Sequence, residues 1–288
     1  MRGGRGVHLA APAIPLELGA PTTAAGEAAT DDAPREDPFG LDPELRRRVL
    51  PAARFLHDRY WRIEVTGIRH VPTSGPALLV ANHSGAIPFD GAMIVTAVEL
   101  RRQRTLRFLY DRFVENLAPV ATFYDKMGGA VATRENAVAR LKAGELLLVF
   151  PEGVPGVAKS FGDRYRLRSF SPGFARLALA LDVPIVPVAV VGAEEIYPVV
   201  GRAEGVGRFL GVPYVPVTPT LPLLGPLGMI PLPSKWIIEF GEPIRTDEYD
   251  AGAADDPMLV FNVTDQVRET IQQTLYRLLA QRRNVFLG

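Results

Sequence analysis

Five short apolar segments, each followed directly by polar or glycine-rich residues, constrain the fold of this chain more than any other feature. They are residues 77–81, 106–110, 145–150, 184–191 and 235–240. Apolar runs of this length without polar alternation are typical of strands buried on both faces of a sheet. Helical patterns lie between them, so the sequence predicts an α/β fold with a largely parallel central sheet flanked by helices.

Capping residues predict where three of these helices begin. Asn136 is expected to cap one helix, and Ser171 followed by Pro172 has the residue types preferred at the cap and first position of another. Asp256 followed by Pro257 predicts the start of a long C-terminal helix, whose apolar residues recur every three or four positions.

The chain divides into a tail and a single domain. Residues 1–40 are rich in Ala, Pro, Gly and Thr and lack a periodic apolar pattern, so we expect a disordered tail. The domain covers 41–288, with a basic amphipathic helix at 41–61, a core at 62–254 and the C-terminal helix at 255–283.

The segment 41–61 is rich in arginine, and Pro51 is expected to kink or split its helix. Its five arginines are Arg46, Arg47, Arg48, Arg54 and Arg59. This pattern is typical of a helix that lies on an anionic membrane surface. It is equally typical of a helix that packs on the domain with a solvated basic face.

The longest uncharged run, residues 209–234, contains seven prolines in 26 residues. That density of proline excludes a membrane-spanning helix, because each proline removes a backbone donor and clashes with the preceding turn. Two interpretations stay open: a rigid loop packed on the domain, or an apolar surface that rests on lipid or lines an acyl-chain groove.

Composition excludes several classes of function. The chain has no cysteine, which rules out thiolate zinc sites, disulfides and a Cys nucleophile, and no other spacing predicts a metal site. Lys and Arg (32) balance Asp and Glu (32), so a nucleic-acid partner is not expected. Residues 153–160 resemble a phosphate-binding loop, but Ala158 replaces a glycine where phosphates need close backbone approach.

One histidine stands out among four. His83 directly follows a predicted buried strand, and Asp90 lies seven residues further on. On one continuous helix the two side chains would lie about two turns apart, but Gly85 and Pro88 predict a loop that brings them together. An imidazole oriented by a carboxylate is a natural general base at neutral pH. One alternative is a structural histidine, with Asp90 capping the next helix. Another is nucleophilic catalysis by the neighbouring Ser84.

Four sequence blocks occur in a characteristic order. They are N-H-S-G at 82–85 with F-D at 89–90, G-G-A-V-A-T-R at 128–134, F-P-E-G at 150–153 and V-P-I-V-P-V at 183–188. This series resembles the four motifs of the glycerolipid acyltransferase family, which includes lysophosphatidic acid acyltransferases, and the resemblance runs from about residue 67 to residue 244.

The resemblance implies an acyltransferase domain without a cofactor, whose partners are acyl-CoA (or acyl carrier protein) as donor and a lysophospholipid as acceptor. By matching position, His83 is implied as the general base and Asp90 as its partner, and Arg134 as a contact of the acceptor phosphate. Glu152 and Gly153 are implied to shape the acceptor site. An enzyme of this kind is expected at the cytoplasmic face of the cell membrane, bound peripherally to an anionic surface.

Basic residues after the third block extend this prediction. Lys159 and Arg164 are the cations closest to the 150–153 turn, so we expect them to contact an anionic part of a substrate. The first block departs from the family pattern, since six residues rather than four separate His83 from Asp90. This departure is the main support for an alternative acceptor, a neutral lipid alcohol such as diacylglycerol. A non-enzymatic lipid-binding protein at a membrane surface is the third possibility.

Overall fold

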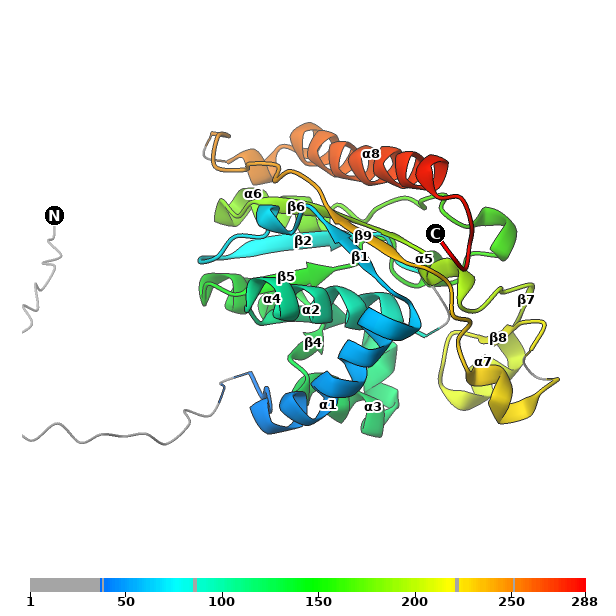
Figure 1. The fold of residues 1–288 in the computed structure, drawn as a ribbon. Helices are drawn as coiled ribbons and strands as arrows, with labels where there is room; N and C mark the ends of the chain where they lie inside the picture. Colours follow the sequence, from blue (N-terminus) through cyan, green and yellow to red (C-terminus); the bar gives the residue numbers. More distant parts are fainter. Residues whose placement is uncertain (1–36, 38, 85–86, 221–222, 251) are drawn as a thin grey trace, which may run out of the picture. The chain divides into compact units, whose positions relative to one another are not determined.

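A seven-stranded sheet with the strand order β1-β9-β6-β2-β5-β3-β4 forms the central layer (Figure 1). Its strands are β1 (Glu64–Thr66), β2 (Ala77–Ala81), β3 (Leu106–Tyr110), β4 (Gly129–Val131), β5 (Leu146–Val149), β6 (Ile185–Val191) and β9 (Ile237–Phe240). The five strands from β6 to β4 run parallel, and β9 pairs antiparallel with β6 and parallel with β1. The predicted α/β fold with a largely parallel sheet is confirmed.

The computed structural model describes residues 37, 39–84, 87–220, 223–250 and 252–288, all within one unit that runs from residue 36 to residue 288. The predicted tail therefore lies outside the described residues, except for its last few positions. Two of those positions pack on the domain: Asp37 forms an ion pair with Arg107, and the guanidinium of Arg140 lies 4.6 Å above the ring of Phe39. Contacts with the domain thus begin before the expected boundary at residue 41.

Helices cover both faces of the sheet (Figure 1). Their bounds are α1 (Pro43–Phe55), α2 (Phe89–Arg102), α3 (Ala118–Lys126), α4 (Arg134–Lys142), α5 (Val154–Val157), α6 (Gly173–Leu181), α7 (Glu204–Leu210) and α8 (Pro257–Gln281). One apolar core lies between the sheet and α2, and another lies between the sheet and α4, α6 and α8. Successive residues of β2 contribute to the two cores in turn, because side chains alternate across a strand.

The helix starts differ from the predicted ones in two of three cases. Asp256 caps α8 as predicted, since its carboxylate accepts from the amides of Met258 and Leu259. The cap of α4 is Thr133 instead of Asn136: its hydroxyl accepts from the backbone amide of Asn136. Helix α6 begins after Pro172 without any side-chain cap.

The predicted basic helix forms α1, and Pro51 lies inside it without splitting it. The helix continues into a wider π-helical turn at residues 56–60, just after the region where the proline removes a backbone donor. Its arginines are largely paired within the domain: Arg46 is buried against Glu99, and Arg47 and Arg48 both pair with Glu44.

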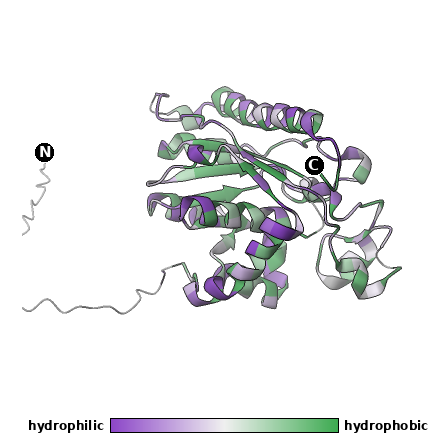
Figure 2. Ribbon diagram, viewed as in Figure 1, coloured by the Kyte–Doolittle hydropathy of each residue, from purple (hydrophilic) through white to green (hydrophobic). Residues whose placement is uncertain are grey.

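The proline-rich run forms part of a small projecting element that we call the apolar lobe, defined as residues 200–220 and 223–230. It contains a two-stranded antiparallel sheet of β7 (Gly201–Ala203) and β8 (Val215–Val217), helix α7 between them, and a 3-10 turn at Gly225–Met229. Figure 2 shows that hydrophobic colouring recurs across this lobe. Of the helices that the structure describes, none combines the length and the apolar character needed to cross a membrane.

Candidate active site

The chemistry-bearing residues gather at one edge of the sheet because they follow parallel strands. His83 follows β2, residues 150–153 follow β5, and Arg134 follows β4. The carboxyl ends of parallel strands meet at one edge, which is where α/β proteins bind ligands. The order β2-β5-β3-β4 places β4 three strands away from β2, roughly 14 Å at the usual strand spacing.

His83 and Asp90 form a hydrogen-bonded pair at this edge. The Nδ1 atom of His83 lies 2.7 Å from Oδ2 of Asp90, so the loop of six intervening residues closes as predicted, although Gly85 itself lies outside the described residues. Asp90 sits in the first turn of α2 and is fully buried. Its carboxylate also accepts from the backbone amides of Ser84 (2.8 Å) and Gly91 (2.8 Å), and these contacts hold it in one orientation.

The imidazole is oriented so that one nitrogen stays available. With Nδ1–H donating to Asp90, Nε2 carries the lone pair and makes no hydrogen bond to any described residue. The ring of Phe150 stacks on the imidazole, with centroids 4.1 Å apart and planes inclined by 22°. The side chain of His83 is 16% exposed, which leaves it partly open to solvent.

Glu152 holds the backbone around the histidine. Its side chain is fully buried, Oε1 accepts from the amide of His83 at 3.0 Å, and Oε2 accepts from the amide of Arg168 at 2.8 Å. The carboxylate thus bridges the end of β2 and the loop that leads to α6. The carboxylate therefore contacts the protein backbone directly, and its implied part in shaping the acceptor site stays a prediction.

A buried ion cluster lies behind Glu152. The Nζ atom of Lys159 is 3.2 Å from Glu152 and 3.1 Å from Glu194, and all three side chains are buried. Burial raises the pKa of Glu194 to about 7, even though Lys159 acts in the opposite direction. The prediction that Lys159 contacts an anionic substrate therefore does not fit the structure, since both carboxylates already occupy its ammonium group.

Two glycines allow the turn after β5 to fit beneath the histidine. Gly153 has a φ of +55°, a conformation that residues with a Cβ rarely adopt. At Gly156 a Cβ would lie 2.7 Å from Cβ of Glu152 and 3.1 Å from Cβ of His83. Gly153 lies in the turn as predicted, whereas Gly156 and the stacked Phe150 are site residues that the sequence analysis did not single out.

The two remaining predicted site residues are exposed cations. Arg134 is the first residue of α4 and makes no hydrogen bond or ion pair with any described residue. Arg164 is also exposed, but its guanidinium donates to the carbonyl of Phe161 and lies 4.3 Å above the ring of that residue. Arg134 is therefore the freer of the two cations for an anionic ligand.

The alternative uses of this region fit the structure less well. Ser84 is buried, and its hydroxyl lies 3.5 Å from Asp90, with no hydrogen bond to His83. The segment 153–160 is no phosphate cradle, because its lysine is enclosed by carboxylates and α5 has only four residues. What the site can do is remove a proton from a group placed at Nε2 of His83.

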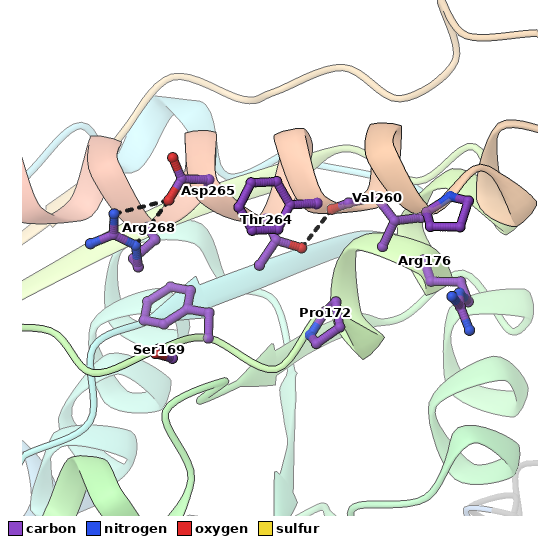
Figure 3. Close-up of a pocket in the computed structure, with 10 residues that line it drawn as sticks. Ser169, Pro172, Arg176, Val260, Thr264, Asp265 and Arg268 are labelled. Carbon is purple, nitrogen blue, oxygen red and sulfur yellow. Dashed lines mark hydrogen bonds and ion pairs between the residues drawn. The ribbon is translucent and has the colours of Figure 1, made fainter.

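A separate pocket of about 520 Å³ lies between helix α8 and the loop that leads to α6 (Figure 3). Figure 3 shows Val260 and Thr264 of α8 facing Ser169 and Pro172 of that loop. None of the predicted site residues lines this pocket.

Comparison with known proteins agrees with this fold. An acyltransferase family model matches residues 62–191, a range that contains β1 to β6 and both members of the His83–Asp90 pair. A crystal structure of a 1-acyl-sn-glycerophosphate acyltransferase from Thermotoga maritima superposes with a TM-score of 0.54 and 18% identity, covering 84% of each chain. The likeness extends over most of the described fold.

Relatives at the level of sequence are of two kinds. Uncharacterized proteins of Mycobacterium leprae and Mycobacterium tuberculosis are 52% and 49% identical over 256 residues, which cover 88% of this chain and 70% and 72% of those proteins. A human protein described as a DGAT1/2-independent enzyme synthesizing storage lipids is 32% identical over 133 residues, which cover 46% of this chain and 41% of that protein.

Proposed function

Because this chain belongs to the glycerolipid acyltransferase family and is an acyltransferase, we propose that it transfers a fatty acyl group to the free hydroxyl of a lysophospholipid. The donor is a thioester, acyl-CoA or acyl carrier protein, and no cofactor takes part. The preferred acceptor is 1-acyl-glycerol-3-phosphate, which would be converted to phosphatidic acid at the cytoplasmic face of the cell membrane.

The observation that carries this proposal is the hydrogen bond between His83 and Asp90 at the sheet edge. Nε2 of His83 takes the proton of the acceptor hydroxyl while its oxygen attacks the thioester carbonyl. The C–S bond then breaks, and the imidazolium returns the proton to the thiolate. Asp90 stabilises the imidazolium between these steps. General-base assistance of this kind contributes about 10²–10⁴-fold to the rate.

Direct transfer is favoured over a covalent acyl-enzyme by the residues available. The chain has no cysteine, and the buried Ser84 makes no hydrogen bond to His83. An acyl-enzyme needs a nucleophile within hydrogen-bond reach of its base. Direct attack needs only the base and an oriented acceptor.

The phosphate of the acceptor is assigned to Arg134. This side chain is exposed and unpaired among the described residues, and it projects from the start of α4 at the same sheet edge as His83. A guanidinium binds phosphate with two parallel hydrogen bonds. The acyltransferase from Thermotoga maritima that shares this fold is described as acting on a 1-acyl-sn-glycerophosphate, which supports the choice.

A second candidate acceptor is a neutral lipid alcohol such as diacylglycerol. It is favoured by the human relative whose description names storage-lipid synthesis, and by the six residues between His83 and Asp90. The structure closes the His83–Asp90 contact despite the longer loop, so this spacing is compatible with either acceptor.

A thiol-release assay with palmitoyl-CoA and a panel of acceptors tests the function. We expect turnover with 1-acyl-glycerol-3-phosphate to exceed turnover with diacylglycerol. Preference for diacylglycerol would establish the second candidate, and release of thiol that depends on neither acceptor would contradict both.

Replacing Arg134 with alanine is expected to raise KM for phosphorylated acceptors by about tenfold or more, with kcat less affected, because a charge-assisted hydrogen bond is worth about 1.5–3 kcal/mol. Steady-state kinetics with and without the acceptor phosphate measure the effect. Arg176→Ala, which removes another exposed arginine, is the matched control. An unchanged KM in Arg134→Ala would contradict the assignment of the acceptor phosphate to Arg134.

A further inference from the structure

We propose that the apolar lobe is the surface by which this protein docks onto an anionic phospholipid bilayer, and not helix α1. The inference that a bilayer docked at the lobe presents lipid substrates to His83 rests on the proposed function. The docking itself is independent of that function.

Large apolar side chains of the lobe are exposed to an unusual degree. Phe209 is 89% exposed, Leu223 82% and Leu227 67%. Five further apolar residues of the lobe, Val200, Val206, Leu224, Met229 and Ile230, are each more than half exposed. Exposed apolar surface of this extent marks a site of interaction with a membrane or another protein.

The lobe is a built element whose backbone is fixed by its own contacts. Strands β7 and β8 pair from Gly201 to Ala203, and the amide of Val200 donates to the carbonyl of Val217. At Gly207 a Cβ would lie 2.5 Å from Cα of Tyr214, so helix α7 packs directly on the following segment. The exposed side chains are therefore held outward by a defined scaffold.

The net positive charge of the lobe favours an anionic lipid surface as its partner. Arg202 and Arg208 are exposed and form no ion pair with a described residue, and Glu204 is the one acidic residue in the lobe's sequence. Each cation near an anionic leaflet strengthens binding about fivefold. Apolar side chains between unpaired arginines are the pattern of an interfacial membrane surface.

The lobe adjoins the catalytic edge. The hydroxyl of Tyr214 donates to the carbonyl of Val157 at 2.8 Å, and the amide of Phe161 donates to the carbonyl of Val199 at 2.9 Å. The first contact joins the lobe to α5, whose Gly156 packs against His83, and the second joins the residue before the lobe to the turn that follows α5. Figure 1 shows α7, β7 and β8 at the same end of the sheet as α5. A bilayer at the lobe would thus lie next to the acceptor edge.

Helix α1, the alternative basic surface, is occupied by internal contacts. Arg46 is buried against Glu99, and Arg54 pairs with Asp58 in the π-helical turn that follows α1. With Arg47 and Arg48 bound to Glu44, the helix has few free cations for lipid headgroups.

Vesicle flotation of the full chain with phosphatidylcholine vesicles that contain phosphatidylglycerol tests the proposal. The double variant Phe209→Ser with Leu223→Ser is expected to bind at least about tenfold more weakly, because each residue loses the free energy of burying a large apolar side chain. Arg202→Gln with Arg208→Gln should weaken binding to anionic vesicles more than about tenfold and abolish its dependence on salt. Met258→Ser with Tyr276→Ser, which removes exposed apolar surface from α8, is the matched control and should bind as the unmodified protein does.

Full vesicle binding by the variant Phe209→Ser with Leu223→Ser, or an equal loss of binding in the α8 control, would overturn the proposal. A loss of binding in Phe55→Ser on α1, with binding by the lobe variants unchanged, would overturn it as well. A change in oligomeric state of the lobe variant in gel filtration would assign the lobe to a second copy of the chain. Thiol release with a short-chain, water-soluble acceptor separates the two proposals, since the lobe variants should keep that activity. Its absence in the unmodified protein would contradict the function while leaving the vesicle result to stand.

Discussion

His83→Ala is expected to lower kcat for acyl transfer by about 10²–10⁴-fold, the usual contribution of a general base, while KM for both substrates changes little. In the proposed mechanism Nε2 of His83 receives the acceptor proton, and no other histidine of the described residues lies at this edge of the sheet. Asp90→Asn should reduce kcat as well, because the neutral amide no longer stabilises the imidazolium. Thiol release measured under saturating substrates checks both variants.

His70→Ala is the matched control for the base. The imidazole of His70 is hydrogen-bonded to the carbonyl of Phe240 and lies before the start of β2, at the other end of that strand from His83. Its removal should leave kcat within about twofold of the unmodified protein, because the half-buried His70 lies away from the reacting atoms. Normal turnover by His83→Ala, with folding shown by circular dichroism, would refute the general-base mechanism.

Local pattern was sufficient to predict four of the five strands in the parallel part of the sheet, β6, β2, β5 and β3. Strands β2 and β3 have the predicted bounds, because β2 is apolar and buried throughout and four of the five residues of β3 are apolar. Strands β1 and β4 were missed, since each has three residues and neither is wholly buried. The antiparallel direction of β9 also depends on contacts between distant segments, which local pattern does not encode.

The candidate site, too, could be predicted from the sequence only in part. The pairing of His83 with Asp90 could be predicted because a glycine and a proline interrupt the six intervening residues. The role of Lys159 was mispredicted, because its sequence neighbourhood is basic while its partners in space, Glu152 and Glu194, are acidic. Glu194 comes from the end of β6, 35 positions away, and only the sheet order brings the two together.

Lys159→Met is the change with the largest expected effect on stability. It leaves Glu152 and Glu194 buried without their cation, and breaking a buried pair costs about 3–5 kcal/mol. For a domain of this size such a loss lowers Tm by roughly 10 °C. Differential scanning calorimetry measures it. Lys142→Met, at an exposed position on α4, is the matched control and should shift stability by less than about 0.5 kcal/mol.

The loss in Lys159→Met should grow with pH. In the unmodified protein the pKa of Glu194 is about 7, above the value of an unfolded carboxyl, so the folded state keeps a proton that the unfolded state releases. Stability therefore falls as pH rises towards 7 and then levels off once Glu194 ionises beside Lys159. Without the lysine that pKa rises further, and the fall continues above 7. The difference between variant and unmodified protein is thus expected to be larger near about pH 8.5 than near about pH 6.

A second substitution shows whether the buried charge is the cause. Adding Glu194→Gln to Lys159→Met removes one of the two uncompensated carboxylates while keeping similar shape, so it should restore part of the lost stability and flatten the pH dependence. A Lys159→Met variant as stable as the unmodified protein at every pH would contradict the contribution of this buried cluster to stability.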